Sequence, residues 1–167
     1  VDEGVKYANK KIIEKAKENP AMKGMGTTMV VAFVEDSQLF VGNVGDSRLY
    51  LLDQEINQVT EDHSFVEILV RAGELTREQA RKHPDKNIIT RAVGAGALAK
   101  PDFFESRLKQ ESIILMCSDG LTNMVEDALI REIVTEDKSI EERALLLVRA
   151  ANDHGGKDNI AVIIIEP

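Results

Sequence analysis

The chain has 167 residues, of which 43% are hydrophobic and 30% are charged, and its formal net charge is −8. This composition indicates a soluble, cytoplasmic protein with one globular domain over residues 1–167, and the negative charge argues against nucleic acid or an anionic membrane as a partner. The single cysteine, Cys117, excludes an internal disulfide, and no apolar stretch is long enough to span a bilayer.

The beginning of the chain predicts a helix followed by strands. Apolar residues recur at helical spacing over residues 1–18, and Pro20 follows as a helix terminator. No start signal precedes this helix, so we expect further residues before it in the natural protein. Residues 27–60 are rich in β-branched and apolar residues and predict an antiparallel meander in which two strands meet at Gly45-Asp46.

The middle of the chain predicts two short helices. Residues 62–83 show a helical pattern that Gly73 interrupts, and Thr76 is a plausible N-cap for the second helix. We expect one apolar face on the first helix, formed by Phe65, Ile68, Leu69 and Ala72.

The last part of the chain alternates strands and helices. The strand patterns cover residues 103–109, 112–118 and 159–166, and the helical patterns cover residues 124–134 and 139–152. The first two of these strands read as a second hairpin, and Ser139 with Glu142 forms a capping box. Helices packed against antiparallel sheet, an α+β fold, are therefore predicted.

Three acidic residues occupy the same kind of position in this pattern. Asp46 and Asp119 each follow an apolar strand, and Asp158 precedes the closing one. Asp and Gly also dominate turns for backbone reasons, so each acid taken alone is more simply interpreted as a turn residue. Taken together, oxygen ligands of this type suit a hard divalent cation such as Mg²⁺ or Mn²⁺.

Six stretches, in this order along the chain, give the sequence a family resemblance. They are GMGTT (24–28), VGDSRLYLL (44–52), TEDHS (60–64), ITRAVG (89–94), CSDGLTN (117–123) and GGKDNIAVI (155–163). The chain resembles the metal-dependent protein serine/threonine phosphatases of type 2C, particularly the bacterial branch. The resemblance implies a central sandwich of two antiparallel sheets flanked by helices, in α-β-β-α layers.

The resemblance also implies a reaction and its ligands. Family members hold two ions, or three in bacterial members, and a water that bridges two ions attacks phosphoserine or phosphothreonine. By position, Asp119 and Asp158 match the ligands of one ion, and Asp46 with Asp119 matches a third, weaker site. The expected cofactor is Mn²⁺ or Mg²⁺, and no catalytic residue is expected besides these ligands. The expected partners are phosphoproteins, the substrates of a serine/threonine kinase, and the protein is expected to be a monomer.

The sequence departs from the family in one respect. The family's first segment carries a phosphate-binding Arg, a Glu-Asp pair and an Asp-Gly motif, and none of them is found here; in KGMGTT, Lys23 stands where the Asp would be. We therefore expect that roughly the first third of a family-sized domain lies outside this chain. An alternative function is a catalytically incomplete regulatory or interaction module.

Other residues receive weaker interpretations. Residues 61–95 are expected to form a flap that helps to choose phosphoprotein partners through its arginines, and the alternative is a surface subdomain without a substrate role. His63 is interpreted as a loop or helix-start residue, with a role near the cleft as the second interpretation. Arg48 is expected to brace the turn at Asp46. Cys117 is expected to be a buried strand residue, because a tyrosine-phosphatase loop would need an Arg where Asn123 stands.

Overall fold

The computed structural model describes residues 1–166, which divide into two compact units. Unit 1 comprises Val1–Phe33, Phe40–Asp46 and Glu61–Phe104, and unit 2 comprises Val34–Leu39, Ser47–Thr60 and the chain from Glu105 onward. None of the helices in this described part of the chain is both long and apolar enough to cross a membrane. The prediction of a single domain over residues 1–167 stays a prediction.

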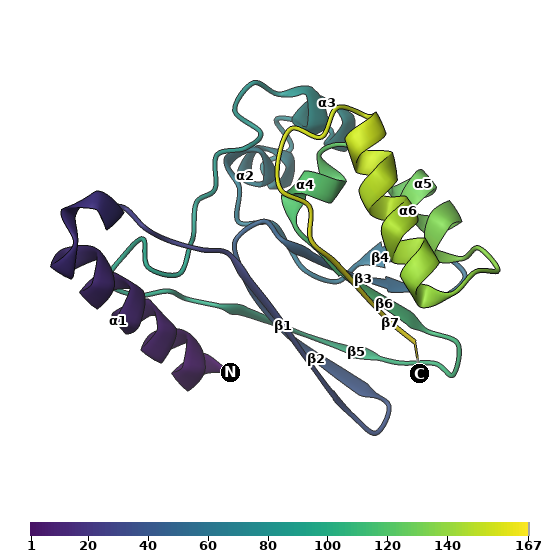
Figure 1. The fold of residues 1–167 in the computed structure, drawn as a ribbon, viewed down its shortest axis with the longest axis horizontal. Coiled ribbons are helices and arrows are strands. Elements are labelled where there is room, and N and C mark those ends of the chain that lie inside the picture. Colours follow the sequence, from purple (N-terminus) through teal and green to yellow (C-terminus); the bar gives the residue numbers. More distant parts are fainter. Residues whose placement is uncertain (167) are drawn as a thin grey trace. The chain divides into compact units, whose positions relative to one another are not determined.

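The elements follow the predicted order closely. The helices are α1 (Asp2–Glu18), α2 (Phe65–Arg71), α3 (Arg77–Lys82), α4 (Asp119–Thr122), α5 (Asp127–Val134) and α6 (Ile140–Asp153), with a 3-10 turn, η1, at Pro20–Met22. The strands are β1 (Met29–Glu35), β2 (Gln38–Val44), β3 (Arg48–Leu52), β4 (Ile56–Gln58), β5 (Asp102–Arg107), β6 (Ile113–Cys117) and β7 (Val162–Ile165). They form two antiparallel sheets, with the strand orders β1-β2-β5 and β4-β3-β6-β7 (Figure 1). Two antiparallel sheets with flanking helices confirm the predicted α+β class.

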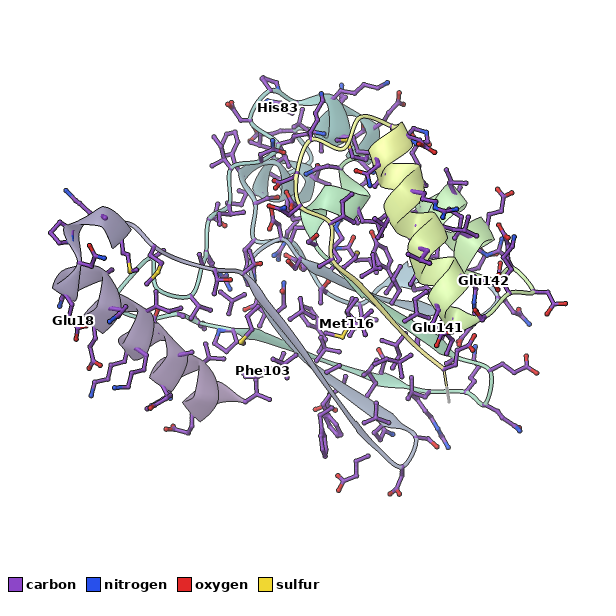
Figure 2. All side chains as sticks on the ribbon, viewed as in Figure 1. Glu18, His83, Phe103, Met116, Glu141 and Glu142 are labelled. Carbon is purple, nitrogen blue, oxygen red and sulfur yellow. The ribbon has the colours of Figure 1, made fainter. Side chains whose placement is uncertain are left out.

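The four-stranded sheet of unit 2 carries the larger core. Tyr50 of β3 pairs with Leu115 of β6, which pairs with Ile164 of β7, and all three side chains are buried against α5 and α6 (Figure 1). Because successive strand residues point to opposite faces, Met116 lies on the face turned away from α6 (Figure 2). The buried Cys117 belongs to the helix-covered core, which confirms its interpretation as a buried strand residue.

Helix α6 is fixed at its N-terminal end by polar contacts. The Ser139 hydroxyl accepts a hydrogen bond from the Glu142 N–H at 3.2 Å, and the Glu142 carboxylate accepts one from the Ser139 N–H at 3.1 Å, which confirms the predicted capping box. Glu141 and Glu142 lie in the first turn of the helix (Figure 2). Negative charges at this end interact favourably with the helix dipole. The buried Arg143 donates to the Val134 carbonyl at 2.7 Å and pairs with Glu166 at 2.6 Å.

Helix α1 packs within unit 1 on a smaller core. Val5 is buried together with Val44 and Val93. The buried Asn9 accepts a hydrogen bond from the Gly94 N–H at 2.6 Å and donates to the carbonyls of residues 96 and 97. These bonds tie α1 to the glycine-rich loop that precedes β5.

The predicted strand pairings are partly wrong. Strands β2 and β3, expected to be neighbours in one meander, lie in different sheets, and so do β5 and β6, expected to be a hairpin. The alternation of apolar and polar residues is the same whether a strand pairs with the next one or crosses to another sheet, so the pattern alone does not separate the two topologies. The chain passes from the sheet of β2 to the sheet of β3 through Gly45. The φ of Gly45 is +112°, a value that glycine adopts readily and that strains other residues.

The predicted apolar face of the first short helix is also partly wrong. Phe65 is 37% and Ile68 is 54% exposed, whereas Val66 and Glu67 of α2 are buried. Burial of Glu67 is compatible with its charge because Arg77 of α3 forms a bidentate ion pair with it. Thr76 caps α3 in a capping box, as predicted.

Candidate functional site

Asp119 follows the central strand β6 and is separated from it by one residue, Ser118. It is half-buried and is the first residue of α4, a four-residue helical turn that the sequence pattern did not predict. Asn123, at the other end of this turn, donates from its side-chain amide to the Asp119 carboxylate at 3.0 Å. The turn thus fixes the orientation of one carboxylate oxygen.

The segment that carries Asp158 runs against this turn inside unit 2. The Ser118 backbone N–H donates to the Ala161 carbonyl at 3.0 Å, and the Ser118 hydroxyl accepts from the Ala161 N–H at 3.0 Å and donates to the Asn159 carbonyl at 3.2 Å. At Gly120, a Cβ would lie 2.2 Å from the Asn159 carbonyl oxygen, so the two backbones approach too closely for a side chain. The structure therefore brings the segments of Asp119 and Asp158 together, and the predicted role of the two acids as ligands of one ion stays a prediction.

Asp46 belongs to the other unit. It is the last residue of the segment Phe40–Asp46 in unit 1, and unit 2 resumes with Ser47. Its approach to Asp119 stays a prediction. Within unit 1, Asp46 directly follows Gly45, whose N–H donates to the imidazole Nδ1 of His63 at 3.1 Å.

A polar cluster around the buried His63 in unit 1 was not found from the sequence. His63 is 5% exposed, and its Nε2 lies 2.9 Å from Oδ2 of Asp102. Arg91 donates to the other oxygen of Asp102 at 2.8 Å. Burial raises the pKa of the Asp102 carboxyl, but the hydrogen bonds from His63 and Arg91 outweigh burial and lower the pKa below its ordinary value. No motif spacing links these three residues, because they come from three separate segments.

His63 itself occupies the position that the sequence suggested. It directly precedes Ser64, the N-cap of α2, so its placement at a helix start is confirmed. Together with Arg91 and Asp102 it lines a pocket of about 240 Å³ in unit 1. The flap residues Glu61 and Arg71 also line this pocket, and they form an ion pair with each other.

Arg48 takes part in a polar network of unit 2. Its guanidinium donates to the Tyr50 hydroxyl at 2.8 Å, and this hydroxyl donates to Asp127 at 3.1 Å. Burial raises the pKa of the Tyr50 hydroxyl well above its ordinary value. Arg48 therefore connects β3 with the start of α5, and its predicted role at the turn of Asp46 stays a prediction.

The donors of unit 2 fit a hard divalent cation. Over residues 1–166, no three His, Cys, Asp or Glu side chains are grouped so that they could hold a metal ion. Mg²⁺ and Mn²⁺ accept one or two carboxylates and keep several waters, so the carboxylates of Asp119 and Asp158 are a suitable partial ligand set. At Gly120 the backbone that follows Asp119 approaches the backbone that follows Asp158, and the binding of one ion by both carboxylates stays a prediction.

Comparison with known proteins identifies the family. The family described as Protein phosphatase 2C matches residues 3–69. The serine/threonine phosphatase stp of Listeria innocua is 42% identical over 163 residues, which are 97% of this chain and 65% of the relative. The chain thus spans less than two thirds of the length of this curated relative.

Solved structures agree with the sequence comparison. The serine/threonine phosphatase Stp1 from Staphylococcus aureus superposes with a TM-score of 0.95 at 40% identity, over 99% of this chain and 66% of that one. The catalytic domain of the serine/threonine protein phosphatase PstP, solved in complex with two manganese ions, gives a TM-score of 0.87 at 32% identity, over 98% of this chain and 68% of that one. The chain belongs to the protein phosphatase 2C family of bacterial serine/threonine phosphatases.

Proposed function

We propose that the protein is a Mn²⁺- or Mg²⁺-dependent protein serine/threonine phosphatase that hydrolyses phosphoserine and phosphothreonine in phosphoproteins. The observation that carries this proposal is the pairing of the Asp119 and Asp158 segments through Ser118 and Gly120. The relatives named as serine/threonine phosphatases and the manganese-bound PstP structure support it.

The residues of the site have distinct proposed roles. Asp119 and Asp158 hold one metal ion, and Asp46 with Asp119 holds a further, weaker one. Bound metal ions lower the pKa of a coordinated water and neutralise the charge that develops on the phosphoryl oxygens. Asn123 orients the Asp119 carboxylate through its hydrogen bond, so one carboxylate oxygen is fixed before a cation arrives. Ser118 fixes the distance between the two acidic segments through three hydrogen bonds.

A direct test is the hydrolysis of a phosphothreonine peptide by the full-length protein with and without Mn²⁺. We expect activity that depends on Mn²⁺ and a loss of at least about 100-fold in Asp119→Asn, because the carboxylate charge that holds the ion is removed. The matched control is Asp137→Asn, an exposed carboxylate in the loop between α5 and α6, which should retain activity. Equal activity of Asp119→Asn and the control, or activity without metal, would contradict the proposal. Phosphopeptide binding without hydrolysis would instead favour the alternative of a non-catalytic regulatory module.

The proposal extends to partners and specificity. The substrates are phosphoproteins made by a serine/threonine kinase, the enzyme acts in the cytoplasm as a monomer, and the flap of residues 61–95 helps to choose among substrates. Three flap arginines, Arg71, Arg77 and Arg91, are each paired with a carboxylate, so selection relies on the shape and the paired charges of the flap rather than on free positive charge. Exchange of residues 61–95 with those of a relative should change the order of preference among phosphopeptides, and an unchanged order would contradict this role.

A further inference from the structure

The backbone of Gly45 is fixed on all sides within unit 1. Its φ is +112°, and a Cβ built on it would lie 2.4 Å from Cγ2 of Thr28. Its N–H donates to Nδ1 of His63, and its carbonyl accepts from the His63 N–H at 2.9 Å and from the Asn43 side chain at 3.2 Å. Both the backbone N–H and the backbone carbonyl of Gly45, the residue before Asp46, therefore have hydrogen-bond partners.

The imidazole of His63 is fixed in turn by Asp102. Because Nδ1 accepts from Gly45, the ring proton of the neutral imidazole is assigned to Nε2, which donates to the Asp102 carboxylate at 2.9 Å. The Arg91 guanidinium lies 3.2 Å from the same Nε2, but a protonated Nε2 cannot accept a hydrogen bond from it. Arg91 donates instead to the Asp102 carboxylate, at 2.8 Å. The His63 carbonyl also accepts from the Thr90 N–H at 2.7 Å, so ring and backbone are both constrained.

We infer that His63, oriented by Asp102, is a positioning residue that sets the direction of the Asp46 carboxylate toward its metal ion. The inference rests on the proposed function, in which Asp46 is a ligand. Hydrogen-bond partners behind a metal ligand typically change metal affinity by about 10- to 100-fold, because they fix the ligand's orientation before binding. The hydrogen bonds between Asp102 and His63 and between His63 and Gly45 form such a support for Asp46. They orient Asp46 through the backbone of the preceding residue.

The first arm of the test measures the backbone without metal. In His63→Asn the side-chain amide lies near the position of Nδ1 and can still accept from the Gly45 N–H, whereas in His63→Gln it lies near Nε2 and retains only the contact with Asp102. We expect hydrogen exchange of the Gly45 amide, followed by NMR, to be about 10-fold faster in His63→Gln than in the wild type and close to the wild-type rate in His63→Asn. Equal exchange rates in both variants would overturn the inference.

The second arm measures Mn²⁺ binding by titration calorimetry in the same full-length proteins. We expect His63→Gln to weaken Mn²⁺ binding by about 10-fold, and to cause no further loss when Asp46→Asn is already present, because both changes remove the same ligand contribution. Asp102→Asn, at a half-exposed position, is a second variant that disturbs the fold less. It should also weaken Mn²⁺ binding only when Asp46 is intact. A loss of equal size with and without Asp46→Asn would show a general structural role and overturn the inference.

The two arms separate failure of the inference from failure of the proposed function. A wild-type protein that binds no Mn²⁺ contradicts the proposed function and removes the ligand role of Asp46, whatever the exchange rates are. A wild-type protein that binds Mn²⁺ with an affinity insensitive to His63 and Asp102 contradicts only the positioning role.

Discussion

The segments around Asp119 and Asp46 are fixed in different ways. In unit 2, the turn after β6 is joined to the Asp158 segment by Ser118 and by a close backbone approach at Gly120. In unit 1, the end of β2 is fixed by a buried side-chain cluster in which His63 and Asn43 bind the Gly45 peptide. The first arrangement depends on two small residues, Ser118 and Gly120, that let two backbone segments approach each other, and the second depends on larger polar side chains that bind one backbone residue. The two regions should therefore respond differently to substitution.

The largest effect on stability is expected for Gly45→Ala. A positive φ costs a non-glycine residue about 1–2 kcal/mol, and the clash with Thr28 adds about 1–3 kcal/mol. The free energy of unfolding, measured by urea denaturation, should fall by about 3 kcal/mol. Gly73→Ala is the matched control, because Gly73 also has a positive φ, of +75°, but has nothing within 4 Å of the added Cβ. A decrease no larger than in this control would show that the Thr28 contact is unimportant.

Gly120→Ala tests the region around Asp119 in unit 2. It should lower the free energy of unfolding by about 2 kcal/mol, because the added methyl group overpacks the site. The added Cβ would lie 2.2 Å from a backbone oxygen of Asn159, which has less freedom to move than a side chain. The control is Gly4→Ala in α1, where the Cβ meets open space and alanine should stabilise the helix by about 0.5–1 kcal/mol. Thermal denaturation of both variants gives the comparison, and an unchanged melting temperature in Gly120→Ala would contradict the close packing of the two acidic segments.

The buried hydroxyl of Tyr50 predicts an alkaline loss of stability in unit 2. Burial raises its pKa above the ordinary value of 10.0, so above pH 10 the unfolded chain loses this proton while the folded chain keeps it. The free energy of unfolding should therefore fall by about 1.4 kcal/mol per pH unit from this group until the folded pKa is reached. Tyr50→Phe lacks the group and should show a shallower slope between pH 10 and 11. Parallel slopes for the two proteins would contradict the burial of the hydroxyl.

The smallest predicted effects concern the two capping boxes, one in each unit. Ser139→Ala and Thr76→Ala each remove one hydrogen bond to the third residue of a helix and should cost about 1 kcal/mol. Ser139→Thr and Thr76→Ser keep the capping hydroxyl and are the conservative controls, so their free energy of unfolding should decrease less. Denaturation of all four variants in urea checks this, and alanine variants as stable as the controls would show that the caps contribute little.

Local features of the fold could be predicted from the sequence because neighbouring residues determine them. The end of α1 before Pro20, the caps at Thr76 and Ser139, and the strand that leads to Asp119 depend on contacts within a few positions. The pairing of strands could not be predicted in the same way. β2 and β5 pair across a long connection, and their alternating pattern is equally suited to a local hairpin.

The candidate site was predictable to the extent that its residues lie in motifs. Asp119 and Asp158 were proposed as ligands because each lies next to a predicted strand within a recognisable stretch; in the structure Asp119 follows β6 closely, whereas Asp158 lies four residues before β7. His63 and Asp102 are 39 positions apart and form a contact that neither periodicity nor spacing indicates. The half-buried carboxylate of Asp102 also resembles an ordinary surface acid in the sequence, so its role becomes visible only in the folded unit.

The most direct test of the proposed metal centre is the Mn²⁺ affinity of the full-length protein compared with that of Asp119→Asn and Asp137→Asn, measured by titration calorimetry without substrate. We predict that Asp119→Asn loses at least about 10-fold in affinity, because its carboxylate is a ligand of the proposed ion, while the exposed control binds as the wild type does. Binding of equal strength in all three proteins would contradict the assignment of the metal centre to Asp119.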